Sequence, residues 1–549
     1  MPAIERAVKG LNASFADVRC CYQQILRVES DDKTFKLLPC ALFHQDFTLP
    51  EQIDYILTEC YITQNKKKKT LQKDAFSFIQ QRRHQPSITD KKLTSSSSFG
   101  IKKPNVLLLG IDSLSRINFR RTMPRTFQYL QENHWFELQG FNKIGDNTFP
   151  NLMALLTSYN ETTAFKKCNP RIKGGLNEPM CNLIWNNFKN FGYKTAYAED
   201  SWTISTFDYL KKGFLKSPTD YYLRPMSIAV AKKLDVKNTR LQYCAGRKHY
   251  AEYIFDYALQ FANILTGDPL FGLFWANSFS HEHFYAPATM DLRILKYFES
   301  MKKDGIFENS IIIFFGDHGV RWGELLNLKS AFLEERLPMM FISLPAWYQH
   351  DYPNFVKALE INQHRLTSPY DIYATMKHIL EVAEPAKKFH YLNDTIQGAS
   401  IFSEIPENRT CNDAGITEHW CTCCPYDTLP KSDGTAKKVT NLILNEINKY
   451  VANKNVSSKC SKLTLKNLNK IEMKIHEKKK QSVYRLKFTA NPKKAQFQAT
   501  VIYNSTANKI TINVEDISRL DSYAKTAGCI DLKEAKKFCV CTNNNKVKH

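Results

Sequence analysis

The sequence lacks several features that would assign a protein class directly. No stretch approaches the ~18 consecutive apolar residues of a membrane-spanning helix, so none is predicted within this chain. Zinc-finger spacing, RNA-binding aromatic motifs and internal repeats are absent, which argues against a nucleic-acid-binding protein. Residues 1–21 contain no apolar signal core, so we expect a signal or an anchor to lie upstream of this chain.

Cysteine is plentiful, and its pattern indicates an oxidising compartment. The chain has 15 cysteines, an odd number that leaves at least one thiol outside intramolecular pairs. Six N-glycosylation sequons accompany them, at Asn12, Asn160, Asn393, Asn408, Asn455 and Asn504. Together they favour disulfides and an extracellular or secretory-lumenal location. The CTCC cluster at residues 421–424 could instead bind zinc, although no second CxxC or histidine pair stands at finger-like spacing.

The charge balance is strongly basic. Lysine and arginine number 76 against 54 aspartate and glutamate residues, which gives a net charge of +22 at pH 7. This excess suits an acidic partner, namely a nucleic acid, an anionic glycan or the lipid headgroups of a membrane surface. No nucleic-acid duplex is expected. The alternative is that lysine runs such as residues 66–69 form only a solvated basic surface.

Changes in composition divide the chain into three predicted regions. Residues 1–100 form an N-terminal cysteine-containing extension that ends in a serine-rich linker at residues 95–100. Residues 101–405 alternate short apolar runs with helical patterns, which predicts an α/β domain with a mostly parallel central sheet flanked by helices. Residues 406–549 form a smaller, cysteine-rich α+β domain, with strands predicted at 486–500 and 509–514.

Individual elements of the α/β domain can be predicted from its apolar runs and helical periodicity. The strands are expected at residues 105–111, 192–198, 269–276, 310–315 and 339–344. The helices are expected at residues 126–133, 183–191, 251–264, 289–303 and 369–380.

Polar side chains follow four of the predicted strands. In strand order they are Asp112, then Glu199 and Asp200, then Asn277, His281 and His283, and then Asp317 and His318. Ligands of open parallel sheets bind beyond the carboxyl ends of the strands, so we expect these groups to share one rim. Alone, each would be read as a turn aspartate or a hydrogen-bonded histidine. Together they form a ligand set for Zn²⁺ or Mn²⁺, beside which Gly316 and Gly319 would let the chain turn tightly.

A candidate nucleophile lies in the stretch GDNTFPN at residues 145–151. Pro150 suits the first turn of a helix that continues through NLMALLTS. Thr148 would then stand at the helix N-terminus, where free amides and the helix dipole favour an anion. A metal-activated hydroxyl at this position could attack phosphorus or sulfur. The alternative is that Thr148 merely caps the helix.

These motifs resemble those of the alkaline phosphatase superfamily, in its sulfatase and phosphodiesterase-like group. They are GIDS at residues 110–113, NTFPN at 147–151, SFSH at 278–281 and GDHG at 316–319. NTFPN looks like the nucleophile motif of the nucleotide pyrophosphatase/phosphodiesterase branch. From about Cys21 to Cys541 the chain is more similar still to an uncharacterised nematode and insect branch, through DSLSR at 112–116, EDSW at 199–202 and RTCNDAGI at 409–416.

The resemblance implies a role for each matching residue. Asp112, Asp317 and His318 would hold one metal, and Thr148 would be the metal-bound nucleophile that forms a phospho-threonine intermediate. Water or an acceptor alcohol would then displace that intermediate, as in a phosphoester hydrolase or a phosphotransferase. His281 corresponds to a second-metal ligand in the two-zinc members. In single-metal phosphoethanolamine and phosphoglycerol transferases, a histidine in this region holds the substrate phosphate instead.

Two positions depart from the two-zinc pattern. Asn277 stands four residues before His281, where the two-zinc members have aspartate, and no motif marks a partner for their third histidine, for which His364 is one candidate. We therefore expect one tightly held Zn²⁺ or Mn²⁺, with His281, helped by His283, contacting the phosphate. A second metal at these positions is the alternative.

The sequence thus predicts a metal-dependent phosphodiesterase or phosphotransferase. A sulfatase is disfavoured because its nucleophile needs arginine at the fourth following position, where this chain has Leu152. Five residues are predicted to contact the substrate: Asp200, Trp202, Arg116, Arg321 and Lys143. The alternative is that the basic residues are ordinary surface charges and that Asp200 caps a helix. The competing function is a catalytically inactive extracellular binding protein on the same fold, which Asn277 favours and the retained Thr148 disfavours.

Overall fold

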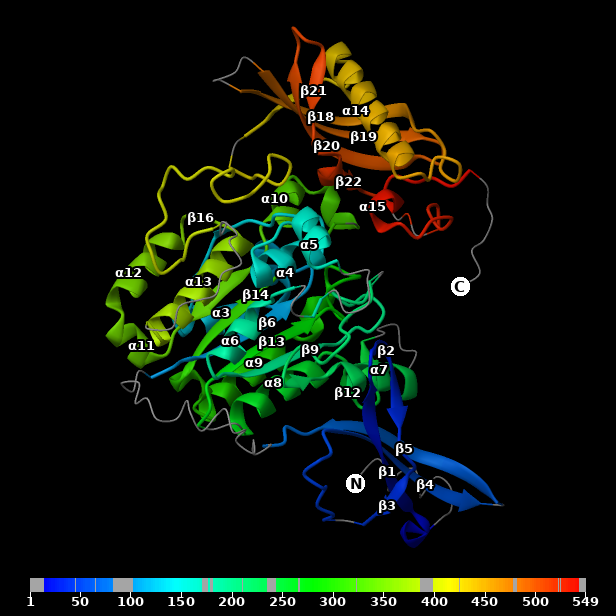
Figure 1. The fold of residues 1–549 in the computed structure, drawn as a ribbon, viewed down its shortest axis with the longest axis vertical. Coiled ribbons are helices and arrows are strands. Elements are labelled where there is room, and N and C mark those ends of the chain that lie inside the picture. Colours follow the sequence, from blue (N-terminus) through cyan, green and yellow to red (C-terminus); the bar gives the residue numbers. More distant parts are fainter. Residues whose placement is uncertain are drawn as a thin grey trace.

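The computed structural model describes residues 14–542 apart from 45, 65, 82–101, 170–175, 178–180, 210, 235–242, 265–266, 322, 386–397, 424, 477–480, 522 and 524. Figure 1 shows an N-terminal sheet, a central α/β part and a C-terminal sheet with one long helix, stacked along the long axis. The linker predicted at residues 95–100 lies outside the described residues. Among the described helices, none has the length and apolar character needed to cross a membrane.

The central sheet confirms the predicted fold class. Its seven strands run in the order β10 (Tyr221–Tyr222), β9 (Lys194–Glu199), β13 (Leu270–Ala276), β6 (Asn105–Ile111), β14 (Ser310–Phe315), β15 (Met340–Ser343) and β7 (Phe136–Glu137). The first five are parallel to one another, β15 runs antiparallel to them, and the edge strand β7 is antiparallel to β15 and so returns to the first direction. All five strands predicted from the sequence are present, and β7 and β10 are too short to have been recognised.

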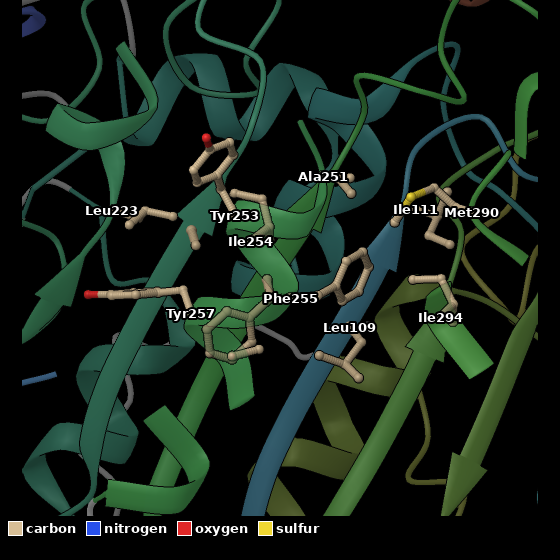
Figure 2. Packing of buried hydrophobic residues seen from close by; sticks show 14 of the residues in the cluster. Leu109, Ile111, Leu223, Ala251, Tyr253, Ile254, Phe255, Tyr257, Met290 and Ile294 are labelled. Atoms are coloured by element: carbon tan, nitrogen blue, oxygen red, sulfur yellow. The ribbon is translucent and has the colours of Figure 1, made fainter. Parts of the chain in front are cut away.

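Both faces of the central sheet are covered, which explains why its strands are continuously apolar. Leu109 and Ile111 of β6 pack on one face against Phe255 and Ile294, as Figure 2 shows. That face is covered by α3 (Pro124–Glu132), α7 (Arg224–Lys233), α8 (Glu252–Ile264) and α9 (Asp291–Lys303). The opposite face is covered by α4 (Thr148–Thr157), α6 (Ile184–Asn190) and α13 (Pro369–Ala383). Alternate residues of each strand therefore serve two separate cores.

Shorter elements complete the central part. The helices are α2 (Arg116–Thr122), α5 (Glu161–Lys167), α10 (Ala331–Arg336), α11 (Ala346–Asp351) and α12 (Pro353–Asn362). Two small ladders join β8 (Gly140–Phe141) to β16 (Leu366–Thr367) and β11 (Cys244–Ala245) to β12 (Lys248–His249).

The N-terminal region is an antiparallel sheet, which sequence reasoning treated only as an extension. It comprises β1 (Arg19–Val28), β2 (Asp31–Leu37), β3 (Ala41–Phe43), β4 (Tyr55–Gln64) and β5 (Lys67–Ser77). Ile25, Leu57 and Ala75 belong to the same apolar cluster as Met226 of α7. The sheet therefore shares a core with the central part.

The C-terminal region has the predicted cysteine-rich α+β character. Helix α14 (Gly434–Asn453) packs on a sheet of β17 (Asp427–Leu429), β18 (Thr464–His476), β19 (Gln481–Asn491), β20 (Ala495–Asn504), β21 (Lys509–Thr511) and β22 (Ser518–Arg519), and α15 (Lys533–Lys536) follows. The single strand predicted at residues 486–500 is wrong. Those residues form the β19–β20 hairpin, because the chain reverses between Asn491 and Ala495.

Six disulfides join described cysteines: Cys20–Cys60, Cys21–Cys40, Cys168–Cys181, Cys411–Cys421, Cys460–Cys539 and Cys529–Cys541. Cys244 stays an exposed thiol. The bond to Cys411 removes the Cys421 thiolate that a zinc ion at the CTCC cluster would need, so the structure does not support the zinc alternative there.

Candidate functional site

Three of the predicted metal ligands meet beyond the ends of two adjacent parallel strands. Asp112 follows β6, and Asp317 and His318 follow β14. Their ligand atoms all lie within 4.8 Å of one another, and all three side chains are buried. His318 Nε2 is 3.3 Å from Asp317 Oδ2 and 3.7 Å from Asp112 Oδ1.

Two backbone N–H groups fix the Asp317 side chain. Ser113 adopts the left-handed conformation with φ 57°, which few residues other than glycine enter. Its N–H donates to Asp317 Oδ1 at 3.0 Å, and the His318 N–H donates to the same oxygen at 2.9 Å. The strand ends are therefore locked together through one carboxylate oxygen of Asp317.

The two glycines beside Asp317 and His318 are explained by close packing rather than by a tight turn. Neither has a positive φ. A Cβ on Gly316 would lie 2.4 Å from the Leu114 carbonyl oxygen, and one on Gly319 would lie 1.7 Å from the Glu334 carbonyl oxygen. The expectation that these glycines permit a tight turn was therefore wrong. Without a side chain, they let the backbone pass close to the backbone at Leu114 and Glu334.

The donor set fits a divalent cation. Burial raises the pKa of Asp317 to about 6 and lowers the pKa of His318 to about 4, so the imidazole is neutral at pH 7. His318 Nδ1 donates to the Gly319 carbonyl at 2.8 Å, which leaves the Nε2 lone pair facing two carboxylates. Asp317 Oδ2 is buried without a hydrogen-bond partner. Bound Zn²⁺ or Mn²⁺ would satisfy these mutually repelling acceptors.

Thr148 is the first residue of α4, and its side chain faces this cluster. Its Oγ1 donates to Asp112 Oδ1 at 3.2 Å. Asn147 occupies the N-cap position and makes no side-chain capping hydrogen bond. Thr148 is therefore not the cap of α4, contrary to the alternative interpretation of the sequence.

Asn151, which sequence reasoning did not single out, holds the loop that carries Thr148. Its Oδ1 accepts from the N–H groups of Ile144 and Gly145 at 2.8 and 3.2 Å. Its Nδ2 donates to the carbonyls of Gly145 and Asn147 at 3.2 and 2.9 Å. One amide thus satisfies four backbone groups just before the nucleophile position.

Asn277 lies at the same rim but outside the cluster. Its Oδ1 accepts from the Ser201 N–H at 3.1 Å, and its Nδ2 donates to Glu199 Oε1 at 3.0 Å. Asp200 in turn accepts from the backbone of Asn277 and from the Ser278 hydroxyl. The amide that would serve a second metal is therefore engaged in a buried network.

His281 is close enough to the cluster to feel the charge of Asp112. Burial alone would lower its pKa, but the hydrogen bond with Glu282 and the charge of Asp112 raise it above its ordinary value. His283 is exposed and stacks on Tyr285 at a centroid distance of 5.3 Å, and His364 is exposed after α12.

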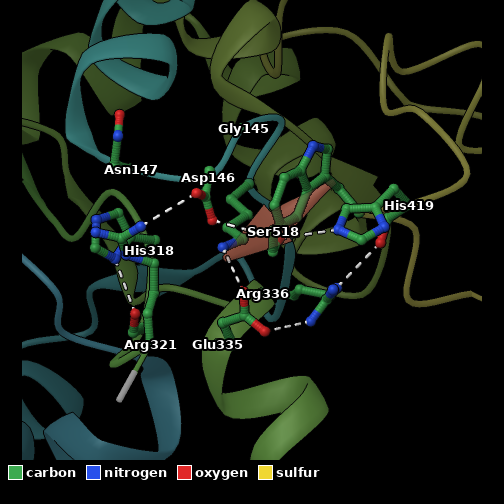
Figure 3. Close-up of polar contacts among 12 residues, drawn as sticks. Gly145, Asp146, Asn147, His318, Arg321, Glu335, Arg336, His419 and Ser518 are labelled. Atoms are coloured by element: carbon green, nitrogen blue, oxygen red, sulfur yellow. Dashed lines mark hydrogen bonds and ion pairs between the residues drawn. The ribbon is translucent and has the colours of Figure 1, made fainter. Parts of the chain in front are cut away.

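The remaining candidates lie in different surroundings. Arg321 pairs with Asp146 at 3.2 Å, close to His318, as Figure 3 shows. Arg116 instead lies 3.9 Å from Glu137 of β7. Lys143 is fully buried and donates to Glu335 at 3.0 Å. Lys232 Nζ lies over the ring of Trp202, 4.7 Å from the ring centroid. Of these side chains, we keep Arg321 as the candidate anion contact.

A family model described as "Protein of unknown function (DUF229)" matches residues 1–469. The chain belongs to this family. No curated protein matches.

Solved structures similar to this chain include three with a TM-score of 0.37. The lipoteichoic acid synthase LtaP from Listeria monocytogenes is 14% identical and covers 55% of this chain and 76% of its own. A protein in the alkaline phosphatase superfamily from Vibrio parahaemolyticus is 12% identical, covering 80% and 86%. The PsFucS1 sulfatase from Pseudoalteromonas sp. is 13% identical, covering 74% and 84%.

Proposed function

We propose that this protein is a metal-dependent phosphoester hydrolase or phosphotransferase in which Thr148 is the nucleophile. One observation carries the proposal: the Thr148 hydroxyl stands at the N-terminus of a helix, 3.2 Å from a carboxylate of a buried Asp/Asp/His cluster. A hydroxyl needs activation to attack phosphorus, and this arrangement provides a place for a cation beside it. Asp112, Asp317 and His318 would hold one Zn²⁺ or Mn²⁺.

A bound cation would supply Lewis-acid polarisation and stabilise the nucleophile as an alkoxide. The residues of the chain account for the rest of the reaction. Thr148 Oγ1 forms a bond to phosphorus while the bond to the leaving alcohol breaks, and the proton lost from Thr148 Oγ1 ends on the oxygen of that alcohol. Water or an acceptor alcohol then breaks the phospho-threonine bond from the opposite side. The amides at the start of α4 face the added negative charge.

His281 is the proposed contact for the transferred phosphoryl group. It is positioned near Asp112 and its raised pKa favours the protonated form, which donates hydrogen bonds to an anion. Because the Asn277 amide is engaged with Ser201 and Glu199, we favour one cation over a second metal at Asn277, His281 and His283.

The proposed substrate is an anionic phosphoester, with a lipid or glycolipid headgroup as the leading class. The net charge of +22 supports an anionic substrate or membrane surface. The six disulfides and the sequons support an extracellular or secretory-lumenal glycoprotein. Substrate identity would have to come from a panel of phosphodiesters that includes lipid headgroups and nucleotides.

The test compares Thr148→Ala with Thr148→Ser on that panel. Thr148→Ala should lose turnover by at least about a thousandfold, because no other hydroxyl replaces the nucleophile. Thr148→Ser should keep part of the activity and should become phosphorylated at residue 148, detectable by mass spectrometry of quenched turnover mixtures. Wild-type turnover by Thr148→Ala would refute the assignment of the nucleophile.

The second candidate is a catalytically inactive binding protein on the same fold. The engaged amide at Asn277 favours it, because a two-metal mechanism would lack a ligand there. This candidate predicts that wild-type protein binds phosphoesters without turnover across the whole panel, even after metal is added.

A further inference from the structure

The C-terminal region contacts the loop that carries the proposed nucleophile. Ser518 of β22 donates from Oγ to Asp146 Oδ1 at 3.5 Å, and Asp146 Oδ2 pairs with Arg321 at 3.2 Å. Asp146 precedes Thr148 by two residues, and Arg321 follows His318 by three. Figure 3 shows Asp146 lying between Ser518 and Arg321. A chain of polar contacts therefore links β22 to the loop that precedes Thr148 and to the loop that follows His318.

Buried groups behind Ser518 set the direction of these hydrogen bonds. Burial lowers the pKa of His419 well below its ordinary value, so its ring is neutral, with one donor and one acceptor nitrogen. His419 Nε2 is 3.1 Å from Ser518 Oγ, and His419 Nδ1 is 3.0 Å from Thr500 Oγ1. Because the carboxylate of Asp146 can only accept a hydrogen bond, the Ser518 hydroxyl must donate to Asp146 and accept from Nε2 of His419. Thr500 then donates to the ring.

Three buried charged side chains beside this network, Glu335, Lys143 and Arg336, pair with one another. Glu335 is paired with Lys143 at 3.0 Å and with Arg336 at 2.6 Å, and both basic side chains are fully buried. Arg336 also donates to the His419 carbonyl at 3.3 Å, which anchors the His419 backbone. Asp146 is thus the carboxylate in this network that reaches Arg321.

We propose that Ser518 and Asp146 are positioning residues for Arg321, which they orient toward the anionic group of the substrate, so that the C-terminal region is part of the catalytic unit. The proposal rests on the proposed function, in which the site binds a phosphoryl group. It goes further by assigning a role to the C-terminal region, because β22 fixes Asp146 and Asp146 fixes the guanidinium. A purely structural contact between the regions would affect unfolding but not anion affinity.

The test is a double-mutant cycle on the full chain, purified without chelators and with its metal content measured. Inorganic phosphate is the probe, and its affinity is measured by titration calorimetry. Arg321→Met should weaken phosphate binding by at least about tenfold, as expected for a charge-assisted hydrogen bond. Ser518→Ala should weaken it by about threefold, and Ser518→Thr should restore it.

The decisive variant combines Ser518→Ala with Arg321→Met. If Ser518 acts through Arg321, the double variant should bind phosphate no more weakly than Arg321→Met alone. The proposal would be overturned if the losses of phosphate affinity in the two single variants multiplied in the double variant. It would also be overturned if Ser518→Ala bound phosphate with wild-type affinity, or if the wild-type protein did not bind phosphate. Ser482→Ala in β19, on the same sheet, is the matched control and should bind as wild type does. Thermal unfolding of each variant reports whether it is folded.

The outcomes separate this proposal from the proposed function. Phosphodiester turnover by the wild type together with multiplying losses would leave the function standing and remove the positioning role. If the double variant binds phosphate no more weakly than Arg321→Met, but the wild type turns over no phosphodiester, the result would support the positioning of an anion contact and would count against catalysis.

Discussion

Replacing Gly319 with alanine should disable the proposed metal site without altering any of its ligands. The added Cβ would lie 1.7 Å from the Glu334 carbonyl oxygen, whereas ordinary contacts of this kind begin near 3.4 Å. The atom it meets is backbone, so no side chain can rotate away. The Gly319 N–H also donates to the Glu335 carbonyl at 3.0 Å, and displacement would break that bond.

The magnitude follows from these two effects. Overpacking in a rigid interior costs about 1–3 kcal/mol, and a clash this short lies at or above the upper end. The loss of one buried hydrogen bond adds about 1 kcal/mol. We therefore expect Gly319→Ala to lower the free energy of unfolding by about 4 kcal/mol. Metal affinity should fall about 10–100-fold, because the Gly319 carbonyl orients the His318 ring.

The assay is thermal unfolding together with metal content after dialysis. Gly434→Ala is the control, since it starts α14 with no atom within 4 Å of the added Cβ, and helix propensity should stabilise it by up to about 1 kcal/mol. Gly319→Ala that retains both wild-type stability and wild-type metal content would refute the reasoning about close backbone packing.

Two further predictions concern the surroundings of the site. Burial raises the pKa of Glu199 from 4.5 to about 8, so its ionisation should cost stability increasingly as pH rises from about 4.5 to 8. Glu199→Gln should therefore be more stable than wild type above pH 8, and the difference should vanish near pH 4. A difference that stays unchanged across that range would contradict this, and Glu407→Gln is the exposed control. Asn151→Ala, which removes all four hydrogen bonds to the nucleophile loop, should lower kcat about 10–100-fold with a smaller change in KM. A change confined to KM would count against its role in positioning Thr148.

The central sheet could be predicted because burial on both faces leaves a continuous apolar run. The runs at β6 and β14 matched the predicted strands residue for residue. The direction of β15 could not be predicted, since an apolar run carries no orientation. The N-terminal sheet was missed because strands such as β5, KKKTLQKDAFS, are polar along much of their length and expose most of their side chains.

The candidate site could be predicted only as far as the strand ends allowed. Asp112, Asp317 and His318 follow parallel neighbours, and topology brings such residues together. Their roles stay predictions until metal and activity are measured. The contact between Ser518 and Asp146 joins residues 372 positions apart, and no local pattern announces it. Arg116 illustrates the opposite case: it ends the DSLSR motif in sequence, yet its guanidinium lies 3.9 Å from Glu137.

The most direct test of the central claim is the metal content of protein purified without chelators, compared with that of Asp317→Asn. The proposal predicts about one Zn²⁺ or Mn²⁺ per chain in the wild type and a strong loss in the variant. About two metals per chain would bring back the second site at Asn277 and His281. No metal in the wild type, even after Zn²⁺ or Mn²⁺ is added, would contradict the account and favour the binding protein.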